Sequence, residues 1–257
     1  MSLRASAAIA RHELRVLRTD PATILFVIVM PLVLVALMQR LFQGVLTAEG
    51  VAGATGAEFA VPGMAVSFVA FNAGFAGLAF FRDHGWGTWD RLRATPASSA
   101  DILVGKVAPS VALSVTQMIV LFGVAVPLFD FRVSGSWLAL AMIVLALALC
   151  LNAFGVAITA VSRTSQRLNA ISSAGGLVLA TMGGAFVPVP AMPEWAQAVA
   201  PTLPTYWAMR GLRAVVLDGG GLGEIAVPVA ALLGFTVLFA ALAAARFRFD
   251  EAKAYWG

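Results

Sequence analysis

The sequence predicts an all-α polytopic membrane protein with six transmembrane helices. Of its 257 residues, 60% are hydrophobic and 12% are charged, and the mean hydropathy is +0.90, far from the balance of a soluble globular domain. Apolar stretches with few or no charges recur along the chain, each close to the roughly 20 residues that cross a bilayer. We therefore expect one transmembrane domain over 1–257, with spans at 22–41, 61–81, 106–129, 137–161, 169–187 and 225–245.

Basic residues are unevenly distributed between the loops. Six spans place both termini on one side of the membrane, and the opposite side then holds only four of the 17 Lys and Arg residues, which leaves 13 for the side of the termini. The positive-inside rule places both termini in the cytoplasm. This asymmetry explains the basic excess, so we expect no nucleic-acid partner. Frequent Ala, Val and Arg with few Lys residues are typical of a GC-rich bacterial genome, which favours a bacterial inner or plasma membrane. The four outer residues are Arg40, Arg132, Arg210 and Arg213.

Residues 1–20 precede the first span and have the pattern of an amphipathic helix. Apolar residues recur at helical spacing on one face, and arginines fall on another. We expect this helix to lie along the cytoplasmic membrane surface, with its arginines among anionic headgroups. The apolar face consists of Leu3, Ala7, Ala10, Leu14 and Leu17, and the basic face of Arg4, Arg11, Arg15 and Arg18.

The most polar loop, 84–97, lies between the second and third spans. Thr88 is expected to cap a short helix, and Asp90 falls in its first turn, where the helix dipole favours an anion. Pro96 disfavours helical geometry at the preceding residue, so the helix should end after about two turns. Such a helix is marginal alone in water.

Two tryptophans in this loop, Trp86 and Trp89, are costly to leave exposed to water. We expect a partner to dock on the loop and cover them, although a solvated connector or interfacial anchoring of the tryptophans are alternatives. Ser98 and Asp101 have the spacing of a capping box, which predicts the start of the next long helix.

The fifth span carries small residues at four-residue spacing, which let another helix approach closely. Beyond it, the proline-rich segment 188–217 predicts two short helices, about 194–200 and 205–217, at the outer membrane surface, where its Trp and Tyr residues suit the headgroup level. The small residues are Ser172, Gly176, Ala180 and Gly184.

Reactive groups are scarce in this chain. Every Asp and Glu lies outside the spans, His12 and His84 lack ligand spacing, and there is no phosphate-binding P-loop sequence. We therefore expect no catalytic residue, no metal site and no cofactor in this chain, which would move or hold a molecule rather than transform it. The lone amides of the spans would either join helices or face a transport path; they are Asn72, Gln117 and Asn152.

Three blocks of the sequence resemble the ABC-2 type permeases, the membrane subunits of ATP-binding cassette exporters. They cover the chain from end to end in the family's order. Asp90 stands where the family usually has Glu, and the approach from Asp83 to Trp86 differs from the usual acidic one. The blocks are Pro62-Gly63; Gly87-Thr88-Trp89-Asp90-Arg91-Leu92 with Ala94-Thr95-Pro96 and Gly105-Lys106; and the proline-rich segment from Pro188 to Arg213.

The resemblance implies a role for each region. Residues 1–20 would be a connecting helix, and the loop would contain a coupling helix that sits on a separate cytoplasmic ABC ATPase, which binds Mg-ATP. A second permease copy, identical or a paralogue, would complete the unit within the lipid bilayer. The coupling residues would be Thr88, Trp89, Asp90, Arg91, Leu92 and Arg93; the path, Phe68, Phe71, Asn72, Phe75, Met182 and Phe186; the extracellular gate, Pro188, Pro193, Trp195, Tyr206 and Arg210.

The compact loops and the aromatic face of the second span favour a small amphipathic cargo such as a drug, an antibiotic or a lipid. Multidrug export and antibiotic resistance are the matching roles. Export of a polysaccharide or glycolipid is an alternative, as is a non-transport anchor or regulator of a partner ATPase. A secondary transporter is disfavoured because the spans lack carboxylates.

Overall fold

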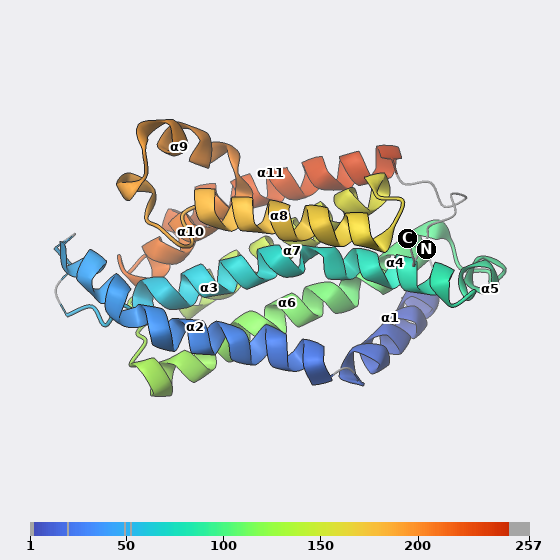
Figure 1. Cartoon of the computed structure of the whole chain (residues 1–257), viewed down its shortest axis with the longest axis horizontal. Helices are drawn as coiled ribbons and strands as arrows, with labels where there is room; N and C mark the ends of the chain where they lie inside the picture. The colour runs from blue at the N-terminus through green and yellow to red at the C-terminus, as the bar shows by residue number, and fades with distance from the viewer. Residues whose placement is uncertain (1–2, 20, 49, 52, 247–257) are drawn as a thin grey trace.

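The computed structural model describes residues 3–19, 21–48, 50–51 and 53–246, and this part of the chain is all-helical. The long helices run side by side along the long axis of the molecule (Figure 1). They are α2 (Pro21–Ala48), α3 (Ala57–Phe71), α4 (Phe75–Gly85), α6 (Ser99–Phe129), α7 (Trp137–Val161), α8 (Ser165–Met182) and α11 (Leu222–Arg246).

Short elements occupy the two ends of this bundle (Figure 1). We call the end that carries α1 (Leu3–Arg18) and α5 (Trp89–Arg93) the α5 end. The opposite end, called the α10 end, carries α9 (Glu194–Val199) and α10 (Pro204–Val216). Three 3-10 turns complete the fold: η1 (Asn72–Gly74), η2 (Val189–Ala191) and η3 (Ala200–Thr202).

In the part of the chain that the structure describes, five helical segments are long and apolar enough to cross a membrane: 25–48, 57–85, 99–129, 137–161 and 222–246. They overlap five of the six expected spans. The expected span 169–187 corresponds to α8, which begins at Ser165, carries several polar residues and ends at Met182. The chain is a multi-pass membrane protein, and the count of six spans stays a prediction.

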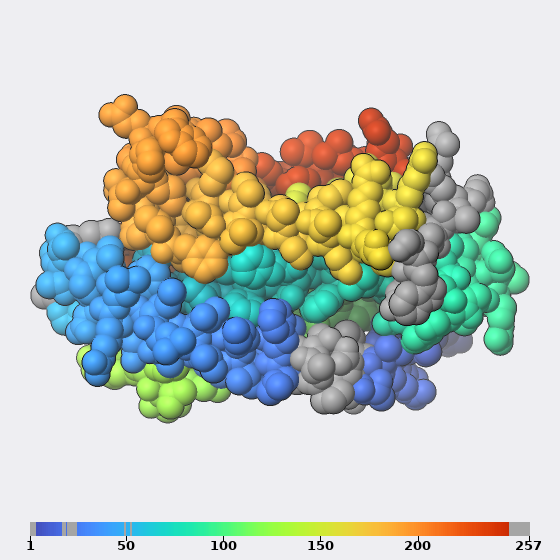
Figure 2. Space-filling model, viewed as in Figure 1, coloured from blue at the N-terminus to red at the C-terminus, as the bar shows by residue number. Residues whose placement is uncertain are grey.

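The α3 helix lies at the centre of the bundle, where every residue from Ala57 to Ala70 is buried. It packs against α2, α6, α8 and α10. A Cβ added at Gly176 of α8 would lie 2.7 Å from the carbonyl oxygen of Ala70, which confirms the predicted close approach at this residue. Figure 2 shows that the other side of α8 lies on one face of the molecule.

The sequence predicted that Gly184 continues the small-residue stripe of α8, and this prediction is wrong. Gly184 lies in the turn after the helix, with φ +92°. There the chain approaches the start of α3, because a Cβ at Gly63 would be 2.2 Å from the Ala185 carbonyl oxygen. The stripe therefore ends at Ala180.

The second expected span is broken in the middle by η1. At this point α7 comes close, since a Cβ at Gly155 would lie 1.7 Å from the carbonyl oxygen of Ala73. Asn152, one turn earlier on α7, donates a hydrogen bond from Nδ2 to Ser114 Oγ of α6 at 3.1 Å. Of the two uses that the sequence left open for Asn152, the structure shows helix-to-helix bonding.

Candidate functional site

The predicted docking loop forms α5, a helix of five residues rather than two full turns. Thr88 stands at its N-cap position, but its side chain does not cap the helix. The hydroxyl instead donates to Asp83 Oδ1 at 3.1 Å, and the Thr88 backbone N–H donates to the Asp83 carbonyl at 2.9 Å. The expected capping bond is wrong because α4 runs on to Gly85 and offers this nearer acceptor. Asp90 lies in the first turn, as predicted.

Trp89 attaches α5 to the rest of the protein. Its side chain is 6% exposed and packs in a cluster with Phe80 of α4 and Ile102 of α6. The His84 ring stacks on it at a centroid distance of 4.5 Å. The protein itself therefore covers Trp89, which corrects the expectation that a partner covers both tryptophans, whereas Trp86 is 57% exposed.

Beneath α5 lies a buried ion-pair cluster of Glu13, Arg82, Asp83 and Lys106. The Lys106 Nζ atom is 2.8 Å from Glu13 Oε1 and 2.6 Å from Asp83 Oδ2, and it also donates to the Ala79 carbonyl at 3.1 Å. Arg82 pairs with the other oxygen of Glu13. Lys106 is 1% exposed, and a buried charge of this kind is tolerated only when it is paired and hydrogen-bonded.

The ion-pair cluster joins four helices at the α5 end. Glu13 comes from α1, Arg82 and Asp83 from α4, and Lys106 from α6, while Thr88 ties the start of α5 to Asp83. These contacts connect α5 to helices that continue into the membrane-spanning bundle.

Glu13 is the functional candidate that the sequence analysis missed. Among the side chains of α1 that the structure describes, Ser6 and Glu13 are buried, whereas Ala7 and Leu14 of the predicted apolar face are exposed. Ser6 donates to Asp101 Oδ1 at 3.2 Å, so α1 contacts α6 through polar groups. A single acid on the side of α1 opposite its arginines was the available signal.

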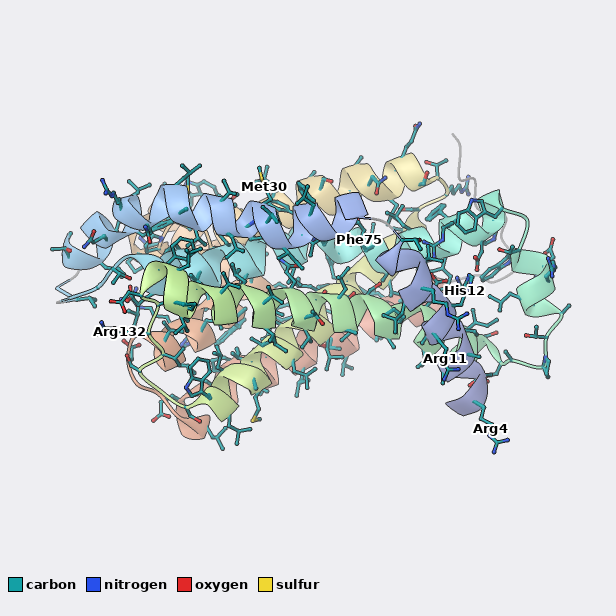
Figure 3. All side chains as sticks on the ribbon, turned by 90° about the horizontal axis from the view of Figure 1, so that it is seen from below. Arg4, Arg11, His12, Met30, Phe75 and Arg132 are labelled. Carbon is teal, nitrogen blue, oxygen red and sulfur yellow. The ribbon has the colours of Figure 1, made fainter. Side chains whose placement is uncertain are left out.

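The predicted coupling residues divide between an anchored side and an exposed side. Trp89 is buried and Leu92 is half-buried, whereas Asp90, Arg91 and Arg93 are exposed. On the neighbouring α1, the Arg4 side chain extends away from the bundle (Figure 3).

Within the described residues, no group of three or more His, Cys, Asp and Glu could hold a metal ion.

The predicted path residues lie in two groups along the α3 and α8 pair. Phe68 is buried between Phe26 of α2 and Phe71, at centroid distances of 5.7 and 6.0 Å. The Asn72 Nδ2 atom is buried without a hydrogen-bond partner among the described residues. The remaining members are half-buried: Phe75 at the start of α4, and Met182 and Phe186 at the α10 end.

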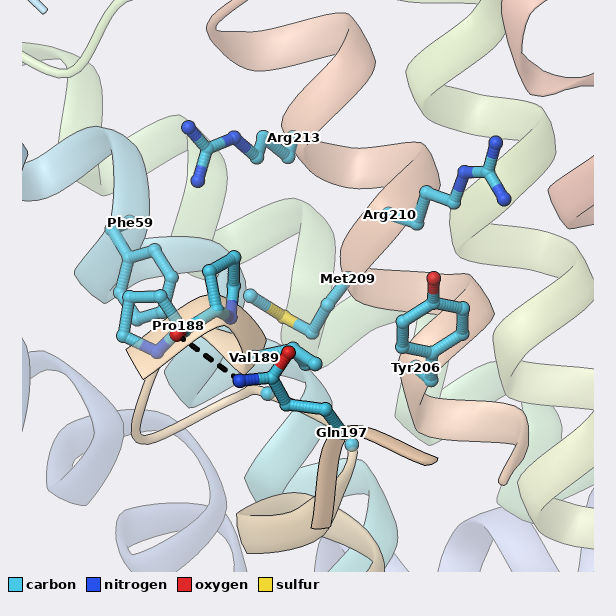
Figure 4. A pocket seen from close by; sticks show the side chains of 11 residues that line it. Phe59, Pro188, Val189, Gln197, Tyr206, Met209, Arg210 and Arg213 are labelled. Carbon is cyan, nitrogen blue, oxygen red and sulfur yellow. Dashed lines mark hydrogen bonds between the residues drawn. The ribbon is translucent and has the colours of Figure 1, made fainter. Parts of the chain in front are cut away.

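Three of the five predicted gate residues line a pocket of about 620 Å³ at the α10 end, shown in Figure 4. They are Pro188, Tyr206 and Arg210. Pro193 and Trp195 are exposed and lie outside this lining. Arg213, which was not among the predicted gate residues, also lines the pocket.

The comparison with protein families identifies one match, the model described as ABC-2 type transporter, over residues 5–217. This range runs from α1 to the residue after α10, so it includes the ion-pair cluster, α5 and the pocket at the α10 end. No curated protein matches the sequence.

Proposed function

The chain belongs to the ABC-2 type transporter family, and from this membership we propose that it is the permease of an exporter driven by a separate ATPase. The family makes the chain a membrane-spanning transport subunit. Our proposal adds that it moves a small amphipathic molecule out of a bacterial cytoplasm, and that both of its termini are cytoplasmic. Hydrolysis of Mg-ATP would take place in the partner chain.

The observation that carries this proposal is the construction of α5. A helix of five residues has little stability of its own. This one is held by buried Trp89 and by the bond from Thr88 to Asp83, while Asp90 and Arg91 remain exposed. An anchored helix with an exposed charged side is suited to receive a soluble partner.

The ion-pair cluster supports a direct mechanical route from that partner to the bundle. Closure of the ATPases around ATP can change the permease only through contacts that differ between its two states. The contacts of α5 reach α4 through Asp83, and those of Asp83 reach α6 through Lys106. We infer that docking on α5 moves these helices together.

A second copy of the permease and the path along α3 and α8 belong to the same proposal. In the single chain Phe68 is almost fully buried, so the path would open only in another state or between two copies. The unpartnered Nδ2 atom of Asn72 supports a polar contact there that the single chain does not supply.

The test is to replace the exposed side of α5 and measure coupling. The variants Asp90→Ala and Arg91→Ala, assembled with the co-purifying ATPase in vesicles, should retain their fold but lose most cargo-dependent ATPase stimulation and transport. Arg167→Ala, an exposed arginine on α8, is the matched control and should behave as the parent chain does. Unchanged coupling in both α5 variants would contradict the proposal.

The same preparation separates the alternatives. Vanadate-sensitive ATPase activity that rises with a hydrophobic drug supports export, whereas ATPase activity that no cargo alters would indicate an anchor or regulator. Transport that persists after ATP depletion, with the ion gradient held constant, would indicate a secondary transporter.

A further inference from the structure

The pocket at the α10 end is built by four segments that are far apart in the sequence. Phe59 comes from α3, Pro188 and Val189 from the turn after α8, and Gln197 from α9; α10 supplies the residues from Tyr206 to Arg213. Its volume of about 620 Å³ is within the range of small-molecule sites in proteins.

The walls of this pocket are fixed by hydrogen bonds from side chains to backbone carbonyls. Thr205 at the start of α10 donates a hydrogen bond to the Leu179 carbonyl of α8, and a Cβ at Gly183 would lie 2.0 Å from the Thr205 hydroxyl oxygen. The Gln197 Nε2 atom donates to the carbonyl oxygens of Pro190 at 3.3 Å and Met192 at 2.8 Å, which holds the loop against α9 (Figure 4). A preformed pocket loses little conformational entropy when a ligand binds.

Two guanidinium groups give the pocket its charge. Arg210 and Arg213 lie one turn apart on α10, and none of the described residues that line the pocket is acidic. In Figure 4 the Arg213 guanidinium lies on the side of Phe59 and the Arg210 guanidinium on the side of Tyr206, so the two side chains point away from one another. These are two of only four arginines that the sequence analysis assigns to the outer side of the membrane.

The ring of Trp207 holds the Arg210 side chain in position. The Arg210 guanidinium carbon is 5.4 Å from the centre of the Trp207 ring, and the Trp207 Nε1 atom is fixed by a 2.9 Å bond to the Pro201 carbonyl.

We propose that this pocket binds the anionic head of an amphiphile, a phosphate or carboxylate, while the apolar part of the molecule packs on Phe59, Val189 and Met209. Guanidinium groups form strong charge-assisted hydrogen bonds with such anions. Binding itself requires no ATPase. The assignment of the pocket to the exported molecule rests on the proposed function, and it narrows the cargo to anionic amphiphiles.

The experiment measures retention of dodecyl phosphate by the full-length protein in neutral-detergent micelles, using native mass spectrometry. The zwitterionic dodecylphosphocholine serves as the comparison ligand. Arg210→Gln and Arg213→Gln should each weaken binding of dodecyl phosphate about tenfold, the usual worth of a hydrogen bond to a charged group. The matched control is Arg132→Gln, which removes an arginine at the same end whose partner is Asp130 outside the pocket, and it should bind as the parent does.

A competition arm distinguishes two sources of the anion. If phosphatidylglycerol displaces dodecyl phosphate, the pocket takes a membrane lipid; if it does not, the pocket takes a single-chain amphiphile. Both results support an anionic site. Equal retention of dodecyl phosphate by the parent and by a variant that carries both Arg210→Gln and Arg213→Gln would overturn the proposal. So would retention of dodecylphosphocholine equal to that of dodecyl phosphate. Because no ATPase is present, this outcome is independent of whether the α5 variants lose coupling.

Discussion

The two ends of the bundle are held together by different interactions. At the α5 end, four helices meet around buried side-chain charges, with Lys106 contacting both Glu13 and Asp83. At the α10 end, segments approach closely where glycine has no side chain, as at Gly63 against the Ala185 carbonyl and at Gly183 against the Thr205 hydroxyl. The first arrangement transmits force between helices along strong directional contacts. The second holds a shape.

This contrast suits the exporter that we propose, in which the ATPase would dock at the α5 end and the cargo would leave at the α10 end. Ion pairs can break and re-form in a second arrangement of the same helices, so they allow a transition between two states. Close-packed backbone has no such alternative partner, which favours a pocket of constant shape. The comparison leads to three predictions in which each end is perturbed separately.

The largest effect is expected for Lys106→Met. It leaves Glu13 with Arg82 and leaves Asp83 with the Thr88 hydroxyl, and removal of one member of a buried ion pair costs about 3–5 kcal/mol. Denaturant titration in micelles should show this loss of unfolding free energy. The control Arg132→Met removes the exposed pair with Asp130 and should change stability by about 1 kcal/mol or less. Similar losses of unfolding free energy in both variants would contradict the distinction between the buried ion-pair cluster and an exposed ion pair.

A smaller and local effect is expected for Gly183→Ala. The new Cβ would meet the Thr205 hydroxyl and disturb its bond to Leu179, at a cost of about 1–3 kcal/mol. Amide hydrogen exchange should rise in α10 and stay unchanged in α1 and α6. Gly175→Ala, whose Cβ would lie at an ordinary 3.5 Å from the Phe154 ring, is the control. Faster exchange at the α5 end would show that the two ends are not independent.

The smallest effect is expected for Ser98→Ala. Ser98 and Asp101 form a complete capping box at the start of α6, and loss of an N-cap side chain costs about 1 kcal/mol. The first turn of α6 should exchange faster, while the ion-pair cluster is retained. Ser99→Ala, one residue later, should leave that exchange unchanged, and equal effects of the two substitutions would contradict the assignment of the cap.

Local rules predicted the local features of this protein well. The capping box at Ser98, the start of α5 after Thr88, and the short helices of the 188–217 segment all depend on residues within a few positions of one another. The predictions were wrong where a distant or competing residue determines the contact that a side chain makes. The Thr88 hydroxyl binds Asp83 instead of capping α5, and Trp89 is buried because Phe80 and Ile102 fold over it.

The candidate site could be located from sequence, but its chemistry could not. The loop that contains α5 and the proline-rich segment were both singled out from the sequence, and each lies at one end of the bundle; their roles in coupling and gating stay predictions. The contact of Glu13 with Lys106 spans 93 positions, and the pocket around Arg213 requires four segments to converge. No periodicity or capping pattern encodes such convergence, because it depends on how the helices pack.

The contact between Glu13 and Lys106 also sets an order of events during synthesis. The ribosome adds about 5–20 residues per second, so roughly 5 to 20 s separate the appearance of the carboxylate from that of its lysine. Arg82, the other cationic partner of Glu13, is made earlier, so the ion-pair cluster has only one of its two cations until Lys106 has been made. The ion-pair cluster is complete only after α6 has been made, so a chain truncated before α6 cannot form the contacts of Lys106.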